Sequence, residues 1–170
     1  LWGVLEEAAK PSATRTANEQ KIGDFFGACM NEAAVERAGA MPLKGDLDAI
    51  EALRDLAGLP AALARLHLRS ARSNAIFGFG SSQDFANSEQ VIAFASAGGL
   101  GLPNRDYYTK DDPKSAETRT KYVEHVAHMF ALLGDDAARA TSEGRTVMEL
   151  ETALAKASLT QVELRDPYKQ

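Results

Sequence analysis

One run of the sequence separates two kinds of pattern: Gly98-Gly99-Leu100-Gly101-Leu102-Pro103-Asn104-Arg105-Asp106-Tyr107-Tyr108. The residues before it resemble a strand, and those after it resemble an amphipathic helix. Its three glycines permit positive φ at almost no steric cost, and Pro103 fixes φ where the chain turns. Because two leucines and two adjacent tyrosines are too apolar for a solvent loop, we expect an ordered connection that packs onto a helical body.

The composition limits the class of protein. A chain of 170 residues suits one domain, and 45% hydrophobic with 25% charged residues is typical of soluble globular proteins. The net charge of −5 argues against nucleic-acid binding, which needs a concentrated basic surface. No apolar run approaches the ~20 residues of a membrane span. The chain starts at Leu1 without a signal peptide, so we expect residues 1–170 to be one helical segment of a longer protein.

The first residues of the chain have apolar side chains at helical spacing, which predicts a short helix. The first helix is expected to stop near Pro11. The run Thr16-Ala17-Asn18-Glu19 matches a capping box, in which a hydroxyl and a carboxylate satisfy the free amides of a helix start. The apolar stripe behind this box predicts a helix to about Ala34.

The helical spacing of apolar residues is lost between Asn31 and Leu43, so this stretch is predicted to be a connection between helices. Asp46 is then the expected cap of a helix that Gly58-Leu59-Pro60 closes. Pro60 also suits the first turn of another short helix.

A change of pattern at Asn74 predicts the one β element. Ala75–Gly80 and Gln90–Ala95 are rich in β-branched and aromatic residues, and the polar run Ser81–Ser88 separates them. This arrangement favours an antiparallel hairpin over about residues 75–96.

Two long helices are expected after the glycine-rich run. Asp112-Pro113 starts the first and Gly134 ends it, and Asp135 is placed to cap the second, which runs to about Ser158. The tail is expected to leave helical geometry before Pro167. The predicted fold class is therefore mainly α, a multi-helix body with one antiparallel hairpin.

Two histidines one helical turn apart, His125 and His128, are the strongest metal candidate. A catalytic zinc needs three protein ligands and an open position, and this segment lacks the glutamate and spacing of the HExxH motif. We interpret them as helix-surface residues, although a small metalloenzyme that uses both remains a third class of function. His67, alone among leucines, is expected to be a half-buried packing residue.

The remaining candidates favour structural interpretations. The pairs Glu6-Glu7 and Glu149 with Glu151 do not converge on one point, so solvated helix faces are expected. Gly78-Phe79-Gly80 and Gly99-Leu100-Gly101 each resemble only half of a dinucleotide fingerprint.

Two further groups of reactive or charged residues lack a chemical partner in the sequence. Cys29 cannot form an internal disulfide because it is the only cysteine, and we expect a small apolar core residue. Arg105-Asp106 is expected to tie its loop to the loop's own backbone. No catalytic, cofactor-binding or metal-binding residue is therefore predicted.

Six blocks in order resemble the N-terminal part of the neprilysin-type (endothelin-converting-enzyme type) zinc metallopeptidases. The run 98–108 is the most specific, because it is similar to that family's Gly-Leu-Gly-Leu-Pro-x-Arg-Asp-Tyr-Tyr signature. The other blocks are Asp24–Glu32, Asp84 with Asn87 and Val91-Ile92, Lys121-Tyr122-Val123, Val147–Ala155, and Arg165-Asp166-Pro167.

This resemblance implies a zinc-dependent endopeptidase acting on peptides of limited size. In the family, two histidines of HExxH and a downstream glutamate hold the metal, which activates water for attack on a peptide carbonyl. Those motifs belong to the C-terminal part of the family's chain and do not occur in this sequence. The resemblance therefore implies a non-catalytic portion that covers the active-site cavity, with zinc in the whole protein and none in this segment.

The same resemblance implies the partners and the location. We expect peptide substrates, a C-terminal catalytic domain of the same chain, and an extracytoplasmic location in a bacterial member. Several relatives pair the counterpart of Cys29 with a distant cysteine, and such a pairing is left open here. Self-association through exposed apolar faces is also expected. The alternative function is a free-standing helical module that binds other proteins.

Overall fold

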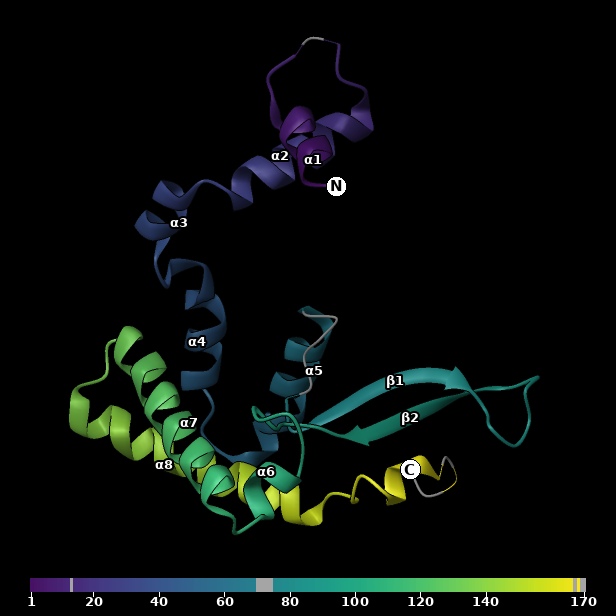
Figure 1. The fold of residues 1–170 in the computed structure, drawn as a ribbon, viewed down its shortest axis with the longest axis vertical. Helices are drawn as coiled ribbons and strands as arrows, with labels where there is room; N and C mark the ends of the chain where they lie inside the picture. Colours follow the sequence, from purple (N-terminus) through teal and green to yellow (C-terminus); the bar gives the residue numbers. More distant parts are fainter. Residues whose placement is uncertain (13, 70–74, 167, 169–170) are drawn as a thin grey trace. The chain divides into compact units, whose positions relative to one another are not determined.

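The computed structural model describes residues 1–12, 14–69, 75–166 and 168 (Figure 1). Those residues form eight α-helices, three 3-10 helices and one two-stranded antiparallel sheet. The mainly α fold class with one hairpin is thereby confirmed. The chain divides into two compact units, Leu1–Asp48 and Ala49–Gln170.

Two packed helices form the core of the first unit, α1 (Trp2–Ala9) and α2 (Ala17–Cys29). The capping box is present, since the Thr16 hydroxyl accepts from the Glu19 amide and the Glu19 side chain accepts from the Thr16 amide. The rings of Trp2 and Phe26 meet edge to face at 5.2 Å. Gly23 allows this close packing, because a Cβ there would overlap the carbonyl of Ala8.

The predicted connection after α2 is wrong, because it contains a helix, α3 (Glu32–Ala38). The helix predicted to reach about Ala34 ends at Cys29 instead. The side chain of Asn31 restarts the helix by accepting from the amide of Ala34 at 3.1 Å. A 3-10 turn, η1 (Met41–Leu43), follows and leads into α4 (Lys44–Glu51). Asp46 lies inside the first turn of α4 and is not its cap.

The second unit begins with short helices that precede the hairpin in the chain. Asp55 caps η2 (Leu56–Gly58), and α5 (Leu59–Arg69) carries Pro60 in its first turn as predicted. His67 near the end of α5 is half-buried and packs its ring edge to face against Phe77 at 4.9 Å, which confirms its packing role.

The hairpin consists of β1 (Phe77–Gln83) and β2 (Val91–Ala97), paired antiparallel from Phe77↔Ala97 to Gln83↔Val91. Its tip is therefore shorter than predicted, because Ser81–Gln83 belong to β1. Asn74, where the pattern changes, lies outside the described residues. Figure 1 shows the two strands as neighbouring arrows that point in opposite directions.

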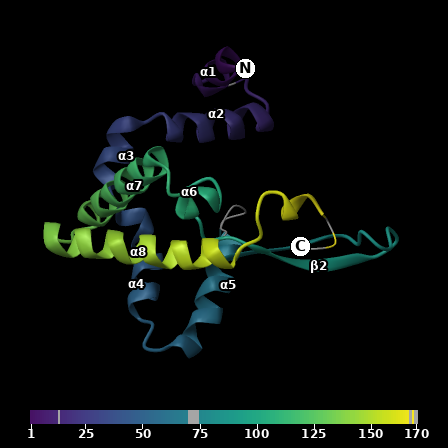
Figure 2. The same cartoon turned by 60° about the horizontal axis from the view of Figure 1, so that its bottom comes forward.

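One short helix begins at the end of the glycine-rich run, and two long helices follow it. The short helix, α6 (Asp106–Thr109), was not predicted. The long helices α7 (Pro113–Leu132) and α8 (Ala137–Ala157) lie side by side (Figure 2). Asp112 caps α7 as predicted, and Gly134 follows its end with φ +110°.

The cap of α8 is Asp136 and not Asp135. Asp136 accepts from the amides of Ala138 and Arg139, whereas Asp135 forms an ion pair with Arg139 at 3.2 Å. The tail contains a 3-10 turn, η3 (Glu163–Arg165), after which Asp166 is extended. Pro167 lies outside the described residues.

Few side chains are buried within the part of the chain that the structure describes. The buried hydrophobic residues are Ala8, Tyr108, Ala140 and Ala155, and the one buried charged residue there is Glu151. Large apolar side chains are exposed in both units, for example Phe25 at 75% and Phe79 at 68%. Within the described ranges, no helix combines the length and the apolar character that crossing a bilayer requires.

Candidate functional site

A buried carboxylate on α8 holds the glycine-rich run in place. Glu151 is 8% exposed, and its Oε2 accepts from the Tyr108 hydroxyl at 2.5 Å and from the Gly101 amide at 3.1 Å. Its Oε1 accepts from the Tyr122 hydroxyl at 2.8 Å. A loop, α6 and α7 thus each supply one donor to one residue of α8. We call these four residues the Glu151 cluster.

The loop approaches its neighbours so closely at two glycines that an added side chain would require those neighbours to shift. A Cβ on Gly101 would overlap the Tyr122 hydroxyl. Gly99 has φ +75°, and a Cβ there would lie 2.8 Å from the Cα of Ile76. Ile76 itself has φ 67°, a strained value for a β-branched residue. These glycines therefore allow the backbone of the loop to lie close to Tyr122 and Ile76 within the second unit.

Further hydrogen bonds fix the rest of the run. The Tyr108 hydroxyl accepts from the Leu102 amide at 2.8 Å, and the Asn104 side chain accepts from the Asp106 amide at 3.0 Å. Arg119 on α7 donates to the carbonyls of Tyr107 and Lys110, both at 2.9 Å. The loop is thus ordered and packed on helices, as its composition predicts.

The electrostatics of the cluster keep both tyrosines protonated. Burial raises the pKa of Tyr108 and of Tyr122 above the ordinary value, and the hydrogen bond from each hydroxyl to Glu151 raises each pKa further. Both hydroxyls therefore act as donors to Glu151. Because donors engage both oxygens of Glu151, the geometry suits positioning of the loop.

The prediction of a solvated face is wrong for Glu151, whereas Glu149 is exposed. A signal in the sequence could have distinguished them. Glu151 lies four residues after Val147 and three before Leu154, so it belongs to the apolar stripe of its helix. A carboxylate on such a stripe needs buried donors.

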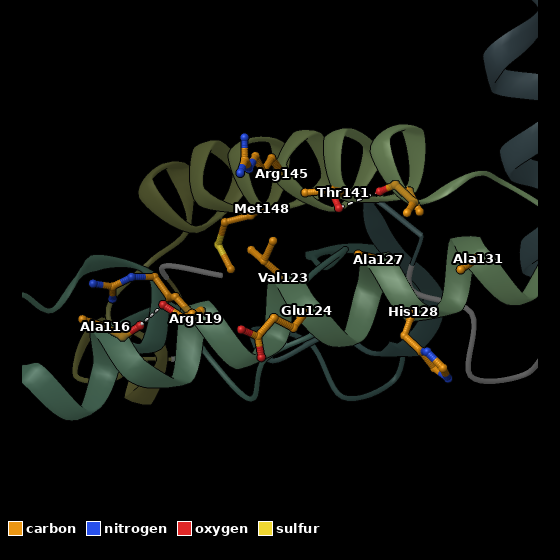
Figure 3. A pocket seen from close by; sticks show the side chains of 13 residues that line it. Ala116, Arg119, Val123, Glu124, Ala127, His128, Ala131, Thr141, Arg145 and Met148 are labelled. Atoms are coloured by element: carbon orange, nitrogen blue, oxygen red, sulfur yellow. Dashed lines mark hydrogen bonds between the residues drawn. The ribbon is translucent and has the colours of Figure 1, made fainter.

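The two histidines of α7 are exposed, and His128 lies at the rim of the groove in Figure 3. Over the described ranges, no three His, Cys, Asp or Glu side chains are grouped so that they could hold a metal ion. The residues present therefore do not make up the zinc site that the resemblance implies.

A groove of about 780 Å³ lies between α7 and α8. Val123 and Met148 face each other across it, and alanines of both helices line its walls (Figure 3). The helices approach closely beside it at Gly144, where a Cβ would lie 2.9 Å from the Val123 carbonyl oxygen.

The other candidates are placed as follows. Gly78 and Gly80 lie in β1, and Glu7 forms an ion pair with Lys10 at 2.6 Å. Cys29 is exposed at the end of α2, so its prediction as a core residue is wrong. That end of the helix contributes to a pocket lined mostly by apolar side chains.

Arg105 and Asp106 do not share one role. The Asp106 carboxylate forms an ion pair with Lys110 at 3.0 Å. The side chain of Arg105 makes no bond to the loop's backbone in the described part of the chain, and its Nε is enclosed without an acceptor there. The prediction that Arg105 ties the loop to its own backbone is therefore wrong.

Solved structures of similar fold are zinc metalloproteases. Zmp1 of Mycobacterium tuberculosis in complex with an inhibitor is 30% identical, with a TM-score of 0.84 over 98% of this chain and 25% of that one. The same enzyme in an open state is 31% identical, with a TM-score of 0.81 over 96% of this chain and 25% of that one.

Curated relatives agree with this class. Mouse endothelin-converting enzyme 1 is 28% identical over 96% of this chain and 21% of its own length. Human membrane metallo-endopeptidase-like 1 is 29% identical over 98% of this chain and 23% of its own length. The chain thus spans about a fifth to a quarter of the proteins it matches.

The family model of peptidase family M13, in its N-terminal version, matches residues 1–170. The chain belongs to peptidase family M13. This match confirms the resemblance to an N-terminal portion and does not favour a free-standing interaction module.

Proposed function

We propose that this chain is the N-terminal covering portion of a zinc metalloendopeptidase whose catalytic motifs lie C-terminal to it. One observation carries the proposal: the whole chain matches the N-terminal model of a peptidase family and superposes on a quarter of a zinc metalloprotease.

The exposed apolar surface supports a covering role. Removing the apolar surface of a large side chain from water is favourable. Exposed side chains such as Phe25, Phe79 and Val91 would be covered where this portion meets the catalytic portion. A substrate that is enclosed between two such portions must be a peptide of limited size.

An extracytoplasmic location fits the name of the membrane metallo-endopeptidase-like relative.

A cleavage assay on the full-length protein tests this function. We expect hydrolysis of short unfolded peptides, loss of hydrolysis with a zinc chelator, and recovery when zinc is added back. A folded protein that contains the same cleavable sequence is the matched control and should resist cleavage. Chelator-insensitive hydrolysis, no hydrolysis, or equal cleavage of peptide and folded protein would contradict the proposal.

A further inference from the structure

Arg105 is a half-buried cation without an acceptor. It precedes α6 in the glycine-rich run, and its Nε is shielded from solvent with no hydrogen-bond partner in residues 1–12, 14–69, 75–166 and 168. No ion pair of its guanidinium is found in those residues either. An enclosed N–H donor without an acceptor is unfavourable, and buried polar atoms normally have a hydrogen-bond partner in a complete protein.

The carboxylates closest to Arg105 along the run and in the Glu151 cluster are already engaged. Asp106, the next residue, forms its ion pair with Lys110 at 3.0 Å. Glu151 accepts from Tyr108, Tyr122 and the amide of Gly101. An acceptor for Arg105 must therefore come from elsewhere.

The loop holds Arg105 in a fixed position. Its backbone is bonded to Glu151 before Arg105 and to Arg119 after it, and Asn104 accepts from the amide of Asp106. A binding group on a rigid support loses little conformational entropy when it binds. The arrangement is therefore preorganised to receive an anion.

We propose that Arg105 binds the carboxylate of an Asp or Glu side chain in the catalytic portion of the same protein, outside residues 1–170. This inference rests on the proposed function. A carboxylate matches the planar guanidinium in charge and can accept two parallel N–H bonds from it. The ion pair would fasten the glycine-rich run to the portion that it covers.

Zero-length crosslinking of the full-length Arg105→Lys protein tests the proposal. Carbodiimide activates a carboxylate, which then forms an amide only with a lysine in direct contact. Peptide mapping should find the introduced lysine joined to an Asp or Glu outside residues 1–170. The matched control is Arg139→Lys, which should link to Asp135 or Glu143, the two carboxylates that form ion pairs with Arg139.

The proposal would be overturned if the introduced lysine were linked only to residues within 1–170. It would also be overturned if this lysine formed no link while the control lysine did. Neutralising the identified carboxylate should lower the melting temperature as Arg105→Met does, and the double variant should be no less stable than the worse single variant. Additive losses would also contradict the ion pair.

If Arg105→Lys does not fold, the proposal can be tested by chemical modification of the unaltered full-length protein. An arginine-selective dicarbonyl reagent should modify Arg105 at least tenfold more slowly than the exposed Arg37 on α3. Equal rates would overturn the proposal. Zinc-dependent cleavage with an unpaired Arg105 would remove this inference and leave the proposed function standing.

Discussion

Glu151 joins three elements through one side chain, so its charge is expected to matter more than its volume. In Glu151→Gln, the amide nitrogen cannot accept, so at least one donor of the cluster loses its partner, and the remaining hydrogen bonds are no longer made to a charged group. We expect the opening free energy of the Gly101 amide to fall by about 1.5–3 kcal/mol, as for hydrogen bonds to charged groups. Native-state hydrogen exchange measures this change. Glu149→Gln, at an exposed position, should stay within about 0.5 kcal/mol.

The raised pKa values of Tyr108 and Tyr122 predict a loss of stability in alkali. Below the ordinary tyrosine pKa of about 10, both states hold the phenolic protons and stability is unaffected. Above about pH 10 the unfolded chain loses protons that the folded chain retains, so the free energy of unfolding falls as pH rises. Urea unfolding at several pH values measures the slope. A Tyr108→Phe/Tyr122→Phe double variant should show a smaller slope, and an equal slope would contradict this cause.

The close packing of α7 against α8 predicts the effect of replacing Gly144 of α8. Ala usually stabilises a helix relative to Gly by about 0.5–1 kcal/mol. At Gly144, however, an added Cβ would meet the Val123 carbonyl at 2.9 Å, so Gly144→Ala should instead destabilise by about 1–3 kcal/mol. Gly45→Ala on α4, where nothing lies within 4 Å, is the control and should be neutral or stabilising. Thermal unfolding measures the change in melting temperature for each variant. If Gly144→Ala left the melting temperature unchanged or raised it, as is expected for Gly45→Ala, the close packing at Gly144 would be refuted.

Elements with local signals could be predicted from the sequence. The Thr16–Glu19 box and the Asp112 cap act within four residues, so each start was placed correctly. The missed helix α3 depends on a cap by Asn31 inside a stretch without an apolar period. At α8, two adjacent aspartates are equivalent in sequence, and only the backbone geometry selects Asp136.

The candidate site was harder to predict because its bonds are long-range. Glu151 lies 50 residues from Gly101 and 43 from Tyr108, so no local pattern links them. The glycine-rich run was identified correctly as ordered, because its composition alone is unusual for a loop. Its acceptor could be found only by noticing a carboxylate on an apolar stripe.

The whole protein is expected to place its chemistry outside this chain. Peptidase family M13 supplies the class, and the residues described here supply a fixed loop, a groove between two helices and exposed apolar side chains. His125 and His128 offer the contrasting possibility of a metal site on α7. The two possibilities differ in where zinc is bound.

Zinc content per chain, measured on the full-length protein and its His125→Ala/His128→Ala variant, separates these possibilities directly. We predict one tightly bound zinc per chain in both proteins, with equal peptide cleavage, because neither histidine holds the metal. Absence of zinc from the unaltered protein, or its loss from the variant alone, would contradict this prediction.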